Sequence, residues 1–123
     1  LIDVYPADEP NHPYMPNKNI TLSNYQQMVR SEVMPARFCN SFEKPEPFVP
    51  NQKTNVNVKL QDVHHTFKKG HRIQIQVQST WFPLIDRNPQ KFVPNIYKAN
   101  AEDFIKATHK VFADSSIEMD ILK

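Results

Sequence analysis

The candidate nucleophiles for acyl transfer are six serines: Ser23, Ser31, Ser41, Ser79, Ser115 and Ser116. A serine nucleophile needs a base within hydrogen-bond reach and a third group that orients the base. One common arrangement holds the serine in a sharp strand-to-helix turn with the pattern G-x-S-x-G. Because Gly70 is the only glycine of the 123 residues, no serine lies in such a turn. We therefore predict no catalytic residue in this chain.

Three histidines, His64, His65 and His71, are the candidate metal ligands. The first two are adjacent, so their side chains would point to opposite faces of a strand. Zinc sites usually show paired spacing together with cysteine or carboxylate ligands. We interpret these histidines as turn and edge residues, and we predict no metal and no cofactor. The sequence around Cys39 contains no activating motif, so we interpret that thiol as inert.

An aromatic segment from Trp81 to Tyr97 is the remaining candidate for a binding function. Aromatic side chains there could form a platform for a sugar or a peptide, anchor the loop, or meet another domain. Aromatic residues and arginine are enriched at the energetic centres of protein interfaces. We therefore predict an interdomain contact made by five residues: Trp81, Phe82, Arg87, Phe92 and Tyr97.

Composition and charge exclude several classes of protein. The formal net charge is +2, and the 15 basic residues are spread along the chain, so we predict no nucleic-acid partner. No run of about 18 apolar residues is present, so we predict no membrane partner. The single Cys39 excludes a disulfide within the chain. It does not define the compartment, which stays unassigned, although a periplasmic or secreted location is compatible with the sequence.

The clearest strand pattern lies in residues 73–77, where apolar side chains alternate with glutamines. The pattern predicts a central strand with Ile75 in the core and Gln76 in solvent. A turn at Gly70 should precede this strand, because glycine adopts a positive φ without steric cost. Pro83 should stop any continuation, because proline cannot donate a ladder hydrogen bond.

Other segments also favour extended structure. Residues 1–5 and 55–60 are predicted strands, and residues 108–112 and 117–122 should pair as a hairpin. Residues 22–38 have apolar side chains at both helical and strand spacing, and we favour a strand with an irregularity near Met34-Pro35.

A short helix should begin at Asn100, a good N-cap followed by acidic residues. Eleven prolines beside one glycine predict long, stiff loops. The fold class is therefore all-β, a β-sandwich or jelly roll with long Pro-rich loops and at most a short helix.

Two motifs together resemble a known family. The sequence K-G-H-R-I-Q-I-Q-V-Q-S-T-W-F-P of residues 69–83 is followed by D-R-N-P at 86–89. This pair resembles the C-terminal jelly-roll domain of the X-Pro dipeptidyl-peptidase family, which includes cocaine-esterase-like and α-amino-acid ester hydrolases. The opening L-I-D-V-Y-P of residues 1–6 is similar to a strand of the same domain.

The resemblance implies that residues 1–123 form a galactose-binding-domain-like jelly roll, a C-terminal accessory domain truncated at its N-terminus. It implies a parent serine hydrolase of dipeptidyl-peptidase or acyl-esterase type, whose catalytic α/β-hydrolase domain is absent from this chain. The implied partner is that catalytic domain, on which the jelly roll packs to help shape the substrate site. The alternative is a stand-alone carbohydrate- or peptide-binding β-sandwich module. A homo-oligomer is left open.

Overall fold

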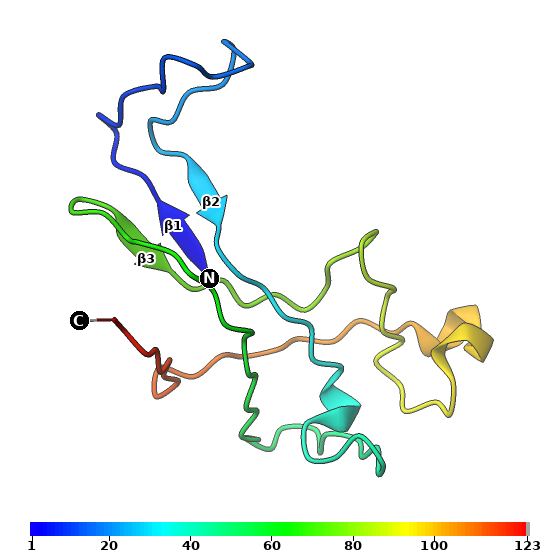
Figure 1. Cartoon of the computed structure of the whole chain (residues 1–123). Coiled ribbons are helices and arrows are strands. Elements are labelled where there is room, and N and C mark those ends of the chain that lie inside the picture. The colour runs from blue at the N-terminus through cyan, green and yellow to red at the C-terminus, as the bar shows by residue number, and fades with distance from the viewer. Residues whose placement is uncertain (123) are drawn as a thin grey trace. The chain divides into compact units, whose positions relative to one another are not determined.

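A three-stranded antiparallel sheet organises the first part of the chain (Figure 1). Its strands are β1 (Ile2–Val4), β2 (Gln26–Met28) and β3 (Arg72–Gln74). The order is β2-β1-β3, so the first strand in sequence is the central one. Asp3 in the middle of β1 is opposite Gln27 on one side and Ile73 on the other.

The computed structural model describes residues 1–122. It divides into unit 1, Leu1–Gln76, which contains the sheet, and unit 2, Val77–Lys123. Three single turns of 3₁₀-helix complete the regular structure: η1 (Ala36–Phe38) in unit 1, and η2 (Ile96–Lys98) and η3 (Ala101–Asp103) in unit 2. In residues 1–122 no helix is long and apolar enough to span a membrane.

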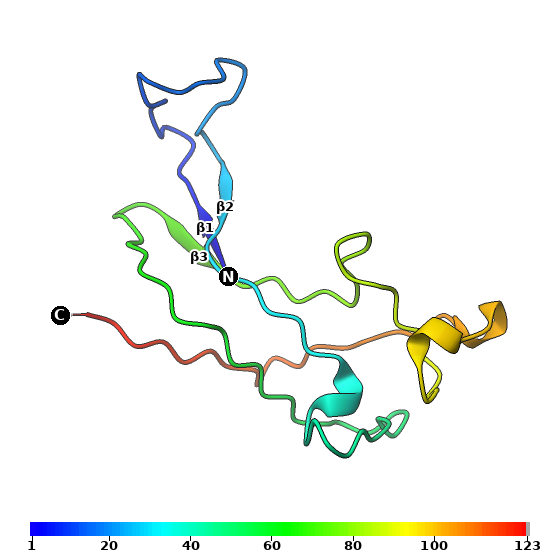
Figure 2. The same ribbon diagram turned by 45° about the vertical axis from the view of Figure 1, so that its right-hand side comes forward.

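The predicted strand at residues 1–5 is confirmed as β1. Val4, 5% exposed, is the one hydrophobic residue counted as buried in the part of the chain that the structure describes. Beyond β1 the chain leaves the sheet and returns to it as β2 (Figure 2). The Tyr5 N–H donates a hydrogen bond to the Tyr25 carbonyl at 2.9 Å, just before β2. Asn24, with φ of 55°, makes the reversal just before β2.

The prediction of a central strand at residues 73–77 is confirmed only at its start, because β3 covers Arg72–Gln74 and lies at the edge of the sheet. β3 ends at Gln74, which pairs with Ile2, the first residue of β1, so the residues that follow have no neighbouring strand within the sheet. Ile75 is 52% exposed, and Gln76 is exposed as well. The alternating pattern therefore correctly indicates extended backbone but does not identify a buried face.

Other expectations are met in part. Residues 22–38 contain β2, and η1 follows Pro35, where the irregularity is predicted. Asn100 precedes η3, so the short helix is confirmed as one 3₁₀ turn. Residues 55–60 and the arms of the predicted hairpin make no ladder within residues 1–122, although Ser115 N–H donates to the Phe112 carbonyl in a turn between those arms. The fold is all-β with almost no helix, and the sandwich stays a prediction.

The Gly70 turn is confirmed, with φ of +93° and a hydrogen bond from His71 N–H to the Lys68 carbonyl at 3.1 Å. A Cβ at position 70 would meet nothing within 4 Å, so a substitution costs energy through the backbone conformation alone. We expect Gly70→Val to lower the free energy of unfolding by about 1–3 kcal/mol in urea titrations. Gly70→Asn should cost less, because asparagine tolerates positive φ better. If Gly70→Val and wild type gave the same urea unfolding curve, the predicted cost of a side chain at this positive φ would be contradicted.

Candidate functional site

Unit 2 contains a shallow hollow of about 230 Å³ that collects three of the five predicted contact residues. We call it the aromatic hollow, and it is lined by Phe82, Asp86, Arg87, Ile96, Tyr97 and Phe104. Phe82 is 61% exposed and Tyr97 is 80% exposed. Large aromatic side chains left this open at one place are typical of a surface that another molecule covers.

Arg87 lies over the ring of Phe82, with its guanidinium carbon 5.5 Å from the ring centroid. An arginine in this position is attracted by the negative face of the ring, a contact worth roughly 0.5–1 kcal/mol at an exposed site. The contact orders two side chains that would otherwise be free to rotate. It therefore prepares a mixed aromatic and cationic surface at the rim of the hollow.

Tyr97 is held at the hollow from both ends. Its backbone N–H donates to Asn95 Oδ1 at 2.9 Å, which caps the start of η2. Its hydroxyl donates to the carboxylate of Asp86, and this hydrogen bond, followed by the negative charge of Asp86, raises the pKa of Tyr97. The side chain is thus both exposed and oriented.

The other two predicted contact residues do not line the hollow. Trp81 is half-buried, and its carbonyl accepts a hydrogen bond from Ile85 N–H at 3.0 Å. Phe92 is half exposed on the following loop. Sequence reasoning missed Ile96 and Phe104 as members. The signals that could have found them are Asn95 and Asn100, two cap residues that place short turns beside the aromatic segment.

Asp103 fastens the loops that carry the hollow. Its side chain is buried, and it accepts hydrogen bonds from Lys91 Nζ at 2.7 Å and from the backbone N–H of Asn100 at 2.9 Å. These two hydrogen bonds lower the pKa of the Asp103 carboxyl, the one from Lys91 having the larger effect. The pair joins residues 89–92 to η3, next to Phe104.

A lowered carboxyl pKa predicts a pH dependence of stability. The contribution of Asp103 is present above the pKa of an unfolded aspartate, about 3.9, and is lost as the pH falls through the lower folded value. We expect the difference in melting temperature between wild type and Asp103→Asn to be full at neutral pH and to shrink below about pH 4. Thermal melts from pH 7 to pH 3 measure this. A difference that is constant over that range would contradict it.

A second cluster lies at the centre of the sheet in unit 1. Asp3 is 1% exposed, and its two carboxylate oxygens accept from His65 Nε2 and His71 Nδ1, each at 2.9 Å. Glu9 Oε2 lies 3.5 Å from the other ring nitrogen of His71, and the Tyr5 ring centroid lies 4.5 Å from that of His71. The interpretation of these histidines as turn and edge residues missed this cluster.

The cluster has a structural rather than a catalytic arrangement. A buried carboxylate needs hydrogen-bond donors, and two imidazoles supply one to each of its oxygens here. Burial, followed by the charge of Asp3, raises the pKa of the Tyr5 hydroxyl, which donates to Gln27 on β2. His64 is exposed and outside the cluster. Within residues 1–122 no group of three or more histidine, cysteine or acidic side chains is arranged to hold a metal ion.

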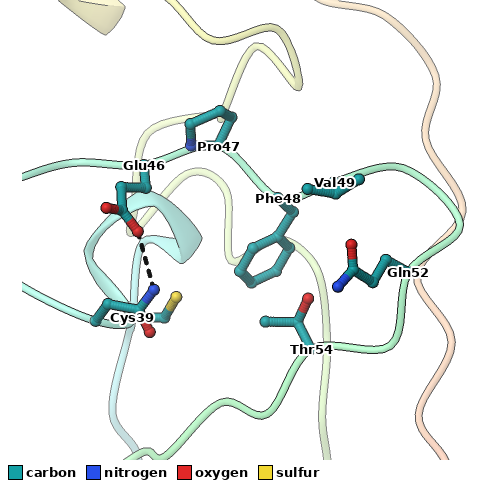
Figure 3. A pocket seen from close by; sticks show the side chains of 8 residues that line it. Cys39, Glu46, Pro47, Phe48, Val49, Gln52 and Thr54 are labelled. Carbon is teal, nitrogen blue, oxygen red and sulfur yellow. Dashed lines mark hydrogen bonds between the residues drawn. The ribbon is translucent and has the colours of Figure 1, made fainter.

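A third feature is a shallow pocket of about 190 Å³ around Cys39 (Figure 3). The ring of Phe48 lies near its centre, between Cys39 and Thr54 (Figure 3). One wall is fixed by Asn40, whose amide donates to Glu46 Oε2 at 3.1 Å. The thiol is half-buried and unbonded to another cysteine, in keeping with a packing role.

The fold and these sites define the class of protein as an all-β domain. Its histidines His65 and His71 hydrogen-bond to the carboxylate of Asp3 and not to a serine. A family model described as the X-Pro dipeptidyl-peptidase C-terminal non-catalytic domain matches residues 1–116, and the chain belongs to this family. The resemblance inferred from the sequence is thereby confirmed. The family is the non-catalytic C-terminal domain of larger enzymes of this kind, so its partner is a catalytic domain in the same protein. A comparison with curated proteins found no match.

Proposed function

We propose that this domain packs against the catalytic domain of a serine hydrolase that cleaves esters or amides, and that it helps to shape the substrate site. The aromatic hollow is the proposed contact surface. The observation that carries the proposal is the gathering of exposed Phe82 and Tyr97 with Arg87 around one hollow. These residue types dominate the energetics of protein interfaces.

Exposed apolar side chains along residues 73–77 support the same proposal. Ile73 and Ile75 are about half exposed, and Val77, just beyond them, is 68% exposed. Scattered apolar side chains are normal on a protein surface, but several along one extended segment favour coverage by another part of the protein. A catalytic domain in the same protein offers such a cover at high effective concentration.

The alternative of a stand-alone carbohydrate-binding module has weaker support. In that alternative, a stacking platform for the carbohydrate would be formed by Trp81, Phe82 and Tyr97. Trp81 is half-buried and lies outside the lining of the hollow, so the largest ring is missing from the platform. Binding of the chain to immobilised glycans, tested on an array, would favour this alternative.

The proposal predicts that the purified 123-residue chain hydrolyses no ester or X-Pro substrate. It also predicts that Phe82→Ala in the full-length protein lowers the melting temperature, because Phe82 lines the proposed contact surface. Hydrolysis assays with a serine-hydrolase inhibitor control, and calorimetry of the variant, measure the two effects. Turnover by the repurified chain that the inhibitor abolishes would overturn the non-catalytic assignment. An unchanged melting curve would count against the docking surface.

A further inference from the structure

The aromatic hollow also indicates the chemistry of its occupant, an inference that rests on the proposed docking to the catalytic domain. The starting point is the charge of Arg87. In residues 1–122 no carboxylate forms an ion pair with this guanidinium. The adjacent acid, Asp86, accepts the hydroxyl hydrogen bond of Tyr97 instead. The nearby cation Lys91, by contrast, has its own carboxylate in Asp103 at 2.7 Å.

The position of Arg87 over Phe82 favours one type of partner. The guanidinium carbon of Arg87 lies 5.5 Å from the Phe82 ring centroid, and within residues 1–122 its N–H groups donate no hydrogen bond, so these donors stay available. Those donors form a rigid fork that matches the two oxygens of a carboxylate. A guanidinium already ordered by a ring also loses less entropy when it binds.

The size of the hollow adds an apolar requirement. The hollow is shallow and open to solvent, with a volume of about 230 Å³, so it is accessible to a side chain presented by a partner surface. Apolar side chains, those of Ile96 and Phe104, also line the hollow. One large apolar side chain therefore fits beside a carboxylate bound by Arg87.

We propose that the aromatic hollow receives a segment of the catalytic domain in which an aspartate or glutamate accepts hydrogen bonds from Arg87 and a neighbouring apolar side chain enters the hollow. Such a pairing gives the interface register as well as affinity, because a misplaced segment would leave the Arg87 charge without a partner. Arg87 is in this account a docking residue and takes no part in the chemistry of hydrolysis.

Zero-length cross-linking of the full-length protein tests this inference. A carbodiimide joins lysine amines to carboxylates and does not couple arginine, so Arg87→Lys places a reactive amine at the predicted contact. The matched control is Arg72→Lys, an exposed position on β3. We expect a cross-linked peptide between position 87 and an aspartate or glutamate of the catalytic domain, absent from wild type and from the control. Peptide mass spectrometry identifies the acid.

A charge exchange then supplies an independent readout. Arg87→Glu should lower the melting temperature of the full-length protein, and replacing the identified acid with lysine in the same molecule should restore it. No cross-link from position 87, a cross-link confined to acids of residues 1–123, or one to a second copy would each overturn the inference. If Phe82→Ala still lowers the melting temperature in that case, the proposed docking survives and only the acidic occupant is wrong. If that variant melts like wild type, the proposed docking and the proposed acidic occupant are both wrong.

Discussion

Replacing Asp3 with alanine should lower the free energy of unfolding of the domain by about 3–5 kcal/mol, the usual cost of removing one partner from a buried charged cluster. The carboxylate is 1% exposed, and both its oxygens are hydrogen-bonded at 2.9 Å. Its removal leaves His65 Nε2 and His71 Nδ1 without acceptors where water has little access. It also removes the side-chain hydrogen bond between β1 and His71, the residue that follows Gly70. Urea unfolding followed by circular dichroism measures the change.

Two further variants make that prediction sharper. Asp3→Asn keeps the volume and one carbonyl acceptor, so it should cost less than alanine. Asp8→Ala removes an exposed carboxylate a few residues away and should change stability by less than about 0.5 kcal/mol. If the alanine variants at positions 3 and 8 unfold at the same urea concentration, the cluster does not stabilise the sheet.

Replacing Tyr97 with alanine should weaken the contact between the domains by about 2 kcal/mol or more and so lower the melting temperature of the full-length protein, because truncating an interface hot spot costs far more than truncating a surface residue. Tyr97 is 80% exposed in this chain and held in place by Asp86 and Asn95. The loss therefore arises from a contact outside the chain. Calorimetry of the full-length protein measures the shift.

The chain offers a matched control for this second prediction. Tyr14 is 86% exposed on the loop between β1 and β2, where the proposal places no contact. Tyr14→Ala should leave the melting temperature nearly unchanged. Equal shifts for the two tyrosines would mean that the aromatic hollow is not a special surface.

Local signals in the sequence predicted local structure well. Gly70 predicted a turn with positive φ, Asn100 predicted a capped turn, and Pro35 predicted an interruption after β2. Each of these depends on a residue's own backbone preferences, which the neighbours along the chain do not change. The all-β class followed from the same kind of evidence.

Signals that depend on distant partners were less informative. The alternation around Ile75 describes an extended segment, but whether a face is buried depends on what packs against it, and nothing in residues 73–77 encodes that. The strand pattern at residues 55–60 failed for the same reason, since a ladder needs a partner. Asp3 within the apolar run of residues 1–5 was a usable signal, because a charge inside a strand needs a buried partner.

The residue types of the candidate site could be predicted from the sequence, but the spatial arrangement of its residues could be predicted only in part. Aromatic residues and an arginine in one loop predicted a contact surface, and Phe82, Arg87 and Tyr97 do line one hollow. Sequence spacing could not show that Trp81 is half-buried or that Phe104 completes the wall. The place of Phe104 follows from the pairing of its neighbour Asp103 with Lys91, which brings two loops together.

Hydroxyl-radical footprinting of the full-length protein tests the central claim, docking through the aromatic hollow, most directly. Tyr97 and Tyr14 have nearly equal exposure in this chain, 80% and 86%, so their oxidation rates compare two positions in one sample. Our account predicts that Tyr97 is strongly protected by the catalytic domain while Tyr14 is oxidised at the rate of an open tyrosine. Equal oxidation of the two residues would contradict it.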